Sequence, residues 1–346
     1  MKKFMYLFVV VCALCLLSAP AFAAPVKLRF AHSEATSNIR HDVCLFFAKR
    51  VAELSKDQVQ VEVFPAGVLG THQSCQEEVS MGTIDFYPST AGLVSVFDPK
   101  RSQELLELPY LFDTPAQAYA FMDSDYAAKI YEPLQARGIR VLATWDNGFR
   151  NLTNNVRAVS SPADMKGMKI RVVQSEMSIK ILNALGASGV PMSYSELYTA
   201  MASGVVDGQE NPVMNIFASK FFEVQKFMSM TRHQYSTLPL LISEATWQRK
   251  LNDEQRKAVL QAAKEAAPYF RRKVVSQEDG QKEAMVKAGL AINDVADFAP
   301  FRKAVEPVYA WAAEKWGKDR VDELRAEVDK IRAKYPVGTE YFGDEK

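Results

Sequence analysis

Cysteine is scarce in this chain, and its spacing excludes most cysteine chemistry. The 346 residues contain four cysteines, of which Cys12 and Cys15 stand in an apolar N-terminal run. Of the remaining pair, Cys44 and Cys75, neither has the C-x-x-C spacing of a redox or zinc site. A disulfide between them and two buried free thiols both fit the sequence.

Motifs that carry catalysis or bind cofactors are also missing. No G-x-S-x-G elbow, G-x-x-x-x-G-K-[ST] loop or G-x-G-x-x-G turn occurs. The four histidines form no H-x-x-x-H pair, and no tight acidic cluster accompanies them. The sequence therefore predicts no catalytic residue, no cofactor and no metal ion. The protein is not expected to be an enzyme.

Neither sign of charge dominates the chain. Its 42 lysines and arginines face 41 aspartates and glutamates. A near-neutral chain has no basic stripe for nucleic acid and no polybasic surface for anionic lipid. What the protein binds must therefore be inferred from individual positions.

Only one long apolar run is present, and it lies at the N-terminus. Lys2 and Lys3 precede the uncharged run 4–17, and Ala21-Phe22-Ala23 forms an A-x-A cleavage site. The run is shorter than the roughly 20 residues that span a bilayer. Residues 1–23 are therefore predicted to be a removed signal peptide that directs the protein to the periplasm, leaving 323 residues with a net charge of −1.

The length and the periodicity of the mature chain predict two α/β lobes. Single cores stop growing at around 250–300 residues, so 323 residues favour two lobes. Alternating strands are expected over 26–31 and 59–64, with a helix over 40–55, which favours a largely parallel sheet. A weak internal repeat supports this division, because 76–85 and 197–207 both contain G-x-x-D after a helix-like segment.

The last third of the chain is predicted to be mainly helical. Asn252 and Gln255 form a capping-box pair at the start of one helix, which Pro268 should break or kink. Segment 320–334 carries charges of both signs and is typical of a solvated amphipathic helix.

The central third contains the most specific signals. Arg150 lies in WDNGFRNLTN, and Arg171 lies in a strand-like stretch at the end of PADMKGMKIRV. An arginine at an otherwise apolar strand start is costly unless it meets an anion. The loop DGQENP, rich in side-chain amides, follows at 207–212.

Together these segments resemble the DctP-type solute-binding subunits of TRAP (tripartite ATP-independent periplasmic) transporters. The similarity extends over almost the whole mature chain, and its specificity comes from the order and spacing of the segments. They are FAH, FPAGVLG, GTIDF, LPYLF, WDNGFRNLTN, PADMKGMKIRV, SYSELYTAM, VVDGQENP and SEATWQ.

The resemblance implies a type II-like periplasmic binding protein fold, with two hinged lobes, a discontinuous chain and long C-terminal helices. Lobe I is expected to comprise 24–147 plus 237–276, and lobe II 148–236 plus 277–346. Closure of the lobes around a ligand is the mechanism that this fold implies.

The resemblance also implies the residues of the site. The family's carboxylate-binding arginine corresponds to Arg171, its second basic contact to Arg150, the asparagine of its ENP loop to Asn211, and a wall aromatic to Tyr194. For Arg171 the alternative is an internal ion pair, for Arg150 a surface position, and for Tyr194 plain core packing.

First-lobe contacts are expected at Ser33, His72 and Thr90. These positions lack the amide and carboxylate groups of the family's sialic-acid binders, so a smaller or differently contacted organic acid is expected. His72 could supply a neutral donor or a further positive charge, because the ordinary pKa of histidine is about 6.5. Its alternative is a solvent-facing position at a helix start.

The predicted function is capture of a small carboxylate by a monomeric periplasmic protein that delivers it to integral membrane TRAP permease subunits. Two other classes stay open at this point. A binding protein that feeds a sensor would share all of these residues, and a periplasmic enzyme would need a nucleophile or metal that the sequence does not show.

Overall fold

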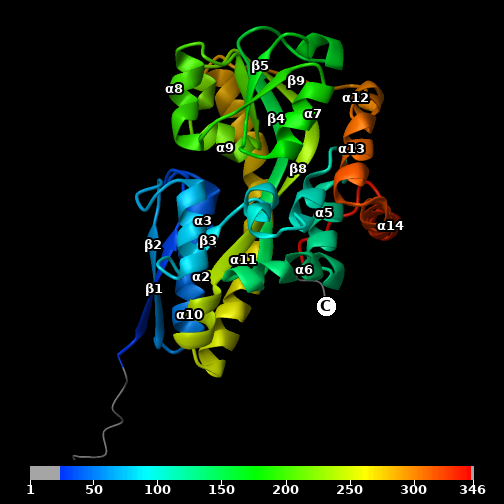
Figure 1. The fold of residues 1–346 in the computed structure, drawn as a ribbon. Coiled ribbons are helices and arrows are strands. Elements are labelled where there is room, and N and C mark those ends of the chain that lie inside the picture. Colours follow the sequence, from blue (N-terminus) through cyan, green and yellow to red (C-terminus); the bar gives the residue numbers. More distant parts are fainter. Residues whose placement is uncertain (1–23, 344–346) are drawn as a thin grey trace, which may run out of the picture.

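The structure is a computed structural model that describes residues 24–343, so the predicted signal peptide lies outside the described residues. The described chain forms two lobes joined by a continuous mixed sheet (Figure 1). The strands are β1 (Val26–Ala31), β2 (Val59–Phe64), β3 (Phe86–Pro88), β4 (Ile139–Asn154), β5 (Lys169–Val172), β6 (Ser188–Pro191), β7 (Gly208–Asn211), β8 (Phe227–Ser243) and β9 (Ala291–Asp294).

Two long strands connect the lobes. The strand order is β2-β1-β3-β8-β4-β7-β5-β6, and β9 pairs with β8. Within each lobe the pairing of β1 with β2 and β3, and of β5 with β6 and β7, is parallel, as expected. The long β4 and β8 are antiparallel to each other, which the prediction of a largely parallel sheet missed. These two strands pair along most of their length, so they connect the two lobes through one continuous sheet.

The helices are α2 (Ile39–Leu54), α3 (His72–Met81), α4 (Ala91–Val94), α5 (Pro115–Met122), α6 (Asp125–Tyr131), α7 (Glu176–Ala184), α8 (Leu197–Ala202), α9 (Val213–Ala218), α10 (Glu244–Arg249), α11 (Asp253–Lys287), α12 (Ala299–Ala304), α13 (Glu306–Trp316) and α14 (Lys318–Lys334). The predicted helix over 40–55 is present as α2, and capping residues mark the starts of α2 and α3. Asn38 caps α2 by accepting from the amide of Arg40, and Thr71 caps α3 in a capping box.

The internal repeat predicted from G-x-x-D is present in both lobes. Gly82 ends α3 and Gly204 follows α8, each in the left-handed region at φ 86° and 73°. Asp85 accepts from the amide of Arg29 at 2.7 Å, and Asp207 accepts from the amide of Lys169 at the same distance. The aspartate thus joins each segment to a neighbouring strand, β1 in one lobe and β5 in the other. This shared geometry supports two related lobes.

The long helix α11 packs across β4 and α2 and passes between the lobes (Figure 1). Its capping box of Asn252 and Gln255 is present as predicted. Of the break or kink predicted at Pro268, the break is wrong, because α11 continues through it to Lys287. Trp145 donates through Nε1 to the carbonyl of Ala263 at 3.1 Å, in the turns before the proline. Tertiary packing on this helix outweighs the local preference of proline.

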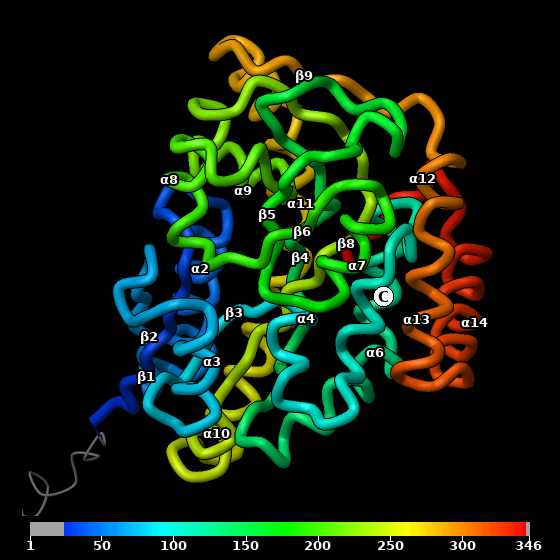
Figure 2. The backbone as a smooth tube through the Cα atoms, turned by 45° about the horizontal axis from the view of Figure 1, so that its top comes forward, coloured from blue at the N-terminus to red at the C-terminus, as the bar shows by residue number. Residues whose placement is uncertain are grey.

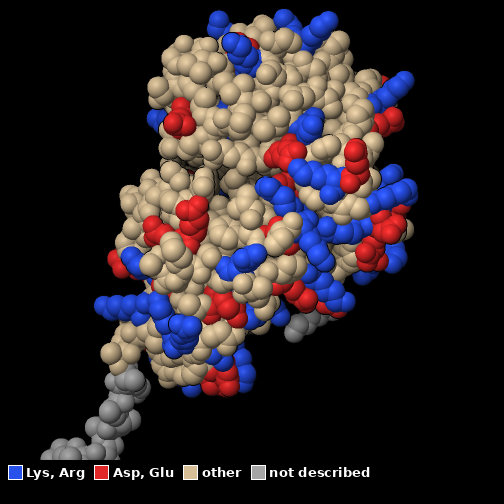
Figure 3. All heavy atoms as spheres, viewed as in Figure 1, with Lys and Arg blue, Asp and Glu red and all other residues tan. Residues whose placement is uncertain are grey.

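The remaining C-terminal helices form one flank. Helices α13 and α14 lie side by side there (Figure 2), and α14 confirms the predicted helix, with Val321, Leu324 and Val328 buried. Charges of both signs are interspersed on this flank (Figure 3). Between residues 24 and 343 no helix combines the length and apolar character needed to cross a membrane.

The two cysteines are free thiols in separate places. Cys44 and Cys75 are both buried, and no disulfide joins them. Burial raises the pKa of the Cys75 thiol to about 11 and holds the pKa of the Cys44 thiol well above its usual range. Of the two readings left open by the sequence, the structure therefore has the pair of buried thiols.

Strand β7 approaches β4 so closely at Gly208 that a side chain should not fit there. A Cβ at this position would overlap the carbonyl oxygen of Thr153, whereas a Cβ on Gly280 in α11 would meet no atom. We expect Gly208→Ala to lower the free energy of unfolding by about 1–3 kcal/mol or more through overpacking. Gly280→Ala should raise it by up to about 1 kcal/mol. Urea denaturation measures both; an undisturbed Gly208→Ala protein would contradict the register of β4 and β7.

Candidate ligand-binding site

Arg171 in β5 is a buried cation without an internal counter-ion. Its side chain is 2% exposed. Nε and Nη2 both donate to the carbonyl of Met192, at 2.9 and 2.7 Å, while buried Nη1 has no hydrogen-bond partner. Burial lowers the pKa of this guanidinium to about 10, an effect that the more distant Glu210 opposes. Within residues 24–343 no carboxylate reaches ion-pair distance, so the alternative of an internal ion pair does not fit.

A cavity of about 180 Å³ lies beside this arginine, between the lobes. His72 from α3 lines one side, and Arg171 and Tyr194 line the other. The Arg171 guanidinium lies 5.9 Å from the centroid of the Tyr194 ring. The centroids of the Tyr194 and His72 rings are also 5.9 Å apart. The remaining lining residues are Thr71, Gln73, Leu93, Val173, Gln174, Met192 and Ser193.

Of the three predicted first-lobe contacts, His72 is the one that lines this cavity. Its Nδ1 lies 2.6 Å from the hydroxyl of Tyr87, which is in turn 2.8 Å from the hydroxyl of Ser33. Burial lowers the pKa of His72 to about 4, and the nearby charges of Arg40 and Arg171 act in the same direction, against Glu34. Of the two roles left open by the sequence, the geometry therefore favours a neutral imidazole.

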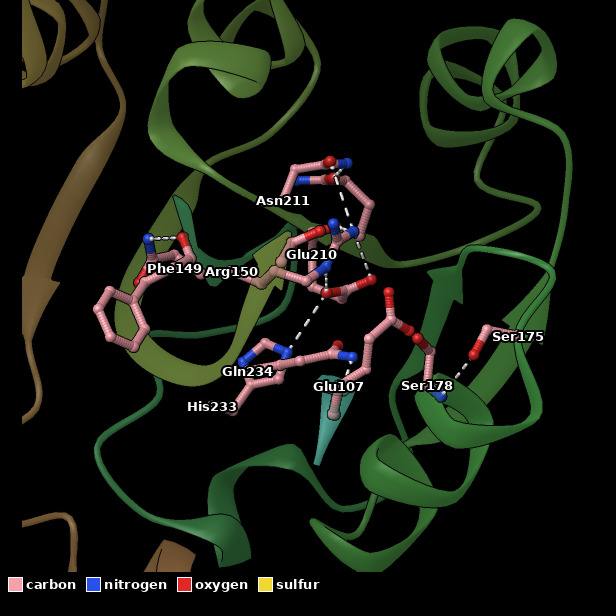
Figure 4. A network of polar contacts seen from close by, with 12 residues as sticks. Glu107, Phe149, Arg150, Ser175, Ser178, Glu210, Asn211, His233 and Gln234 are labelled. Carbon is pink, nitrogen blue, oxygen red and sulfur yellow. Dashed lines mark hydrogen bonds and ion pairs between the residues drawn. The ribbon is translucent and has the colours of Figure 1, made fainter. Parts of the chain in front are cut away.

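Arg150 is buried, but it carries its own counter-ion (Figure 4). Its Nε and Nη2 bind the carboxylate of Glu210, and Nη2 lies 2.8 Å from Oε1. Nη2 also contacts Asn211 Oδ1 at 3.4 Å. The sequence alternative of a surface position does not fit, since the residue is 3% exposed. Register shifts interrupt the pairing of β4 with β8 on either side of Arg150.

Glu210 and His233 complete this network from β7 and β8 (Figure 4). His233 Nε2 lies 3.3 Å from Glu210 Oε2, and its Nδ1 lies 2.8 Å from the Thr231 hydroxyl. Burial alone would raise the pKa of Glu210, but the Arg150 charge and the hydrogen bonds with His233 and Arg150 together lower the pKa to about 2. Glu210 therefore stays ionised and neutralises Arg150.

A second buried ion pair stands on the first-lobe side. Arg40 in α2 binds Glu34 and donates through Nη2 to Asn147 Oδ1 at 2.7 Å. Both charged side chains are almost wholly buried. Burial would raise the pKa of Glu34, but Arg40 and a hydrogen bond with His32 lower it instead. Like Arg150, Arg40 is already neutralised.

Side-chain amides join the lobes behind the cavity. Asn38, at the start of α2, donates to Asn215 Oδ1 in α9 at 2.9 Å. Asn215 donates in turn to Asn147 at 3.2 Å and to Asn211 at 3.4 Å. All four amides are buried. This arrangement connects the predicted ligand contact Asn211 to a contact between the two lobes.

The structure thus brings some predicted residues together and separates others. Arg171, Tyr194 and His72 share one cavity, and Ser33 reaches it through Tyr87. Arg150 and Asn211 lie together in the adjoining buried network. Thr90, which begins α4, is 8% exposed and its hydroxyl has no partner, but it does not line the cavity. Tyr194 packs on Phe221 as well, so it contributes to both wall and core.

Sequence reasoning missed several residues of this region. Glu210 stands directly before Asn211, and an acid beside the ENP loop could have been weighed as the partner of Arg150. The pairing of Arg40 with Asn147 joins positions 107 residues apart and left no local signal. The amide contact of Asn38 with Asn215 joins positions 177 apart and is equally invisible in the sequence.

Glu107 is a further buried acid, next to this network (Figure 4). Its Oε2 has no hydrogen-bond partner and points at Gly92, where a Cβ would overlap it. Burial raises the pKa of Glu107 from 4.5 to about 7, and Glu104 and Glu210 add to the effect. The side chain is therefore largely protonated in mildly acidic solution.

This shift predicts how stability depends on pH. A carboxyl whose pKa rises on folding binds more protons when folded, so its contribution is lost as pH rises from about 4.5 to 7. Replacing it by the neutral amide in Glu107→Gln should remove that loss. The variant should gain up to about 3 kcal/mol relative to the parent between pH 5 and pH 8. Denaturant unfolding at several pH values measures this; parallel curves for the two proteins would refute it.

Comparisons with known proteins identify close relatives of this architecture. Residues 30–315 match the model of the DctP family, bacterial extracellular solute-binding protein family 7. The 2,3-diketo-L-gulonate-binding periplasmic protein YiaO of Escherichia coli is 35% identical over 268 residues, covering 76% of this chain and 81% of YiaO.

Solved structures agree in fold over most of the chain. A TRAP periplasmic solute-binding protein from Polaromonas, bound to D-erythronate, has a TM-score of 0.83 at 30% identity, covering 87% of this chain and 98% of its own. One from Sulfurospirillum deleyianum, with bound succinate, has a TM-score of 0.81 at 27% identity, covering 88% and 99%.

Proposed function

The chain belongs to the DctP family of bacterial extracellular solute-binding proteins, and from this we propose that it captures a small carboxylate in the periplasm for a TRAP permease. Its relatives are periplasmic solute-binding proteins, and the neighbouring structures hold small organic acids. We further propose that residues 1–23 are the signal peptide that takes it there. The ligand is bound and released without chemical change.

One observation carries the proposal: Arg171 is buried beside a cavity and lacks an acid of its own. A desolvated cation without a counter-ion is costly, and an entering carboxylate removes that cost. The carbonyl of Met192 holds Nε and Nη2, so the guanidinium is fixed before the ligand arrives and Nη1 is left for it. Such preorganisation limits the entropy lost on binding.

We propose that the ligand is trapped by closure of two hinged lobes, divided as 24–147 plus 237–276 and 148–236 plus 277–343 among the described residues. The second lobe would hold the carboxylate on Arg171, with Tyr194 as a wall and Arg150 and Asn211 behind it. The first lobe would then bring His72 over the ligand, with Ser33 and Thr90 further out. Exclusion of water strengthens the attraction between arginine and carboxylate, so binding and closure favour each other.

Removal of the guanidinium is the direct test of this proposal. Arg171→Ala should weaken binding of a carboxylate ligand by about 2–5 kcal/mol, or roughly 30- to several-thousand-fold. Arg171→Lys should also weaken it, because a point charge does not reproduce the guanidinium fork. Titration calorimetry, after a thermal-shift screen of organic acids has identified the ligand, measures both.

Arg157→Ala removes an exposed arginine of the same lobe and serves as the control, with unchanged affinity expected. The assignment of Arg171 fails if its alanine variant binds as tightly as the parent protein.

The amide contact between the lobes gives a second test. Asn38→Ser keeps a side chain that can cap α2 but removes the amide that donates to Asn215. We expect ligand affinity to fall about 2- to 12-fold, the effect of one net hydrogen bond of 0.5–1.5 kcal/mol. The loss should appear as faster dissociation, because the contact forms only on closure.

Ser37→Ala is the matched control at the same interface, because the Ser37 hydroxyl makes only a long, exposed hydrogen bond of 3.4 Å to the carbonyl of Ala218. Stopped-flow dissociation rates distinguish the two variants. Equal rates for Asn38→Ser and the parent protein would show that the amide contact does not stabilise the closed form.

A further inference from the structure

We propose that this site selects acids with a single carboxylate and rejects dicarboxylates, because the cavity offers one uncompensated positive charge. The inference rests on the proposed function and narrows its ligand class. Family membership does not decide the matter, since one neighbouring structure holds the monocarboxylate D-erythronate and another the dicarboxylate succinate. The charges around the cavity instead determine which class of acid this site prefers.

Three buried arginines surround the space between the lobes, and two of them are neutralised by the protein. Arg40 is paired with Glu34, and Arg150 is paired with Glu210 through two nitrogens. The acids of both pairs are at most 3% exposed. Breaking such a pair to serve a ligand would leave a buried carboxylate without a partner, which costs several kcal/mol. Of these three arginines, only Arg171 has a positive charge that no carboxylate of the described chain neutralises.

His72 does not supply a second charge. The hydroxyl of Tyr87 approaches its Nδ1 at 2.6 Å, and a neutral imidazole can accept that proton while presenting Nε2–H to the cavity. The charged groups near the ring are Glu34, Arg40 and Arg171, and its pKa is lowered to about 4. Above pH 5 His72 therefore acts as a neutral donor.

The other groups around the site add no positive charge. The polar lining residues Thr71, Gln73, Gln174 and Ser193 are uncharged, and Leu93, Val173 and Met192 are apolar. Glu107 beside the Arg150 network contributes only negative charge in whatever fraction it ionises. A second carboxylate would meet no cation of its own.

The cavity is also small, with a volume of about 180 Å³. On a four-carbon acid the second carboxylate lies only a few bonds from the first, so it would be desolvated with the rest. Desolvating an unpaired carboxylate is unfavourable by several kcal/mol.

Matched ligand pairs that differ by one charge test the proposal in the unmodified protein. The pairs are 4-hydroxybutyrate and succinate, D-erythronate and meso-tartrate, and D-galactonate and galactarate. In each pair a terminal hydroxymethyl group becomes a carboxylate while the rest of the carbon chain is kept. Calorimetry at pH 7 should show that, in every pair that binds, the monocarboxylate binds at least 100-fold more tightly.

A charge-releasing variant tests the cause. Glu34→Gln frees Arg40 from its acid and should shift the affinity ratio at least tenfold toward the dicarboxylate of each pair. Glu62→Gln makes the same chemical change at an exposed position of β2 and should leave the ratio unchanged. If Glu34→Gln does not fold, the comparison of ligand pairs in the unmodified protein still decides.

The outcomes separate this inference from the proposed function. A dicarboxylate that binds as tightly as its monocarboxylate partner overturns the inference and leaves carboxylate capture intact. Binding of no acid, in these pairs or in the thermal-shift screen, overturns both. If the protein prefers the monocarboxylate but the affinity ratio of each pair is the same in Glu34→Gln, the number of unpaired positive charges does not explain the preference.

Discussion

The site depends on one electrostatic constraint, the burial of the Arg171 guanidinium without an internal acid. Most buried charges in this molecule are paired, and the two other arginines near the cavity, Arg40 and Arg150, have carboxylates of their own. Arg171 instead donates hydrogen bonds through two of its nitrogens to the carbonyl of Met192. A carbonyl dipole orients the guanidinium but does not neutralise it, so the charge remains available to an anion.

The surrounding network explains how one charge can be held at this place. Two buried ion pairs and a chain of side-chain amides lie behind the cavity and bind mainly to one another, so they fix its walls without competing for the ligand. The amides also cross between the lobes through Asn38 and Asn215. In the proposed mechanism, occupancy of the cavity and closure of the lobes are therefore part of one physical process, in which water leaves the site and weak polar contacts become stronger.

Local features of the fold could be predicted from the sequence because they depend on neighbouring residues. The alternating strands β1 and β2, the helix α2 and the glycines that end two helices follow from periodicity and φ preference. Features set by distant contacts could not be predicted. Pro268 remains inside α11 because the helix is held by packing along its length, and β4 pairs antiparallel with β8 across about a hundred intervening positions.

The same distinction holds for the site. Arg171 could be singled out because an arginine in a short apolar strand is locally anomalous, and the resemblance to a family assigned it a role. The neutralisation of Arg150 could not be inferred with certainty, since Glu210 lies 60 residues away. The Arg40–Glu34 pair was missed although its members are six residues apart, because burial on both sides is a property of the folded lobes. The number of unpaired positive charges at the cavity could therefore be determined only from the structure.

A crystal structure of the protein with its bound ligand would test the central claim most directly. The account predicts a ligand carboxylate within hydrogen-bonding distance of Arg171 Nη1, with the contacts of Arg171 to Met192 and of Arg150 to Glu210 preserved. A ligand whose carboxylate is held by Arg150 or Arg40 after displacement of Glu210 or Glu34, with Arg171 unoccupied, would contradict it.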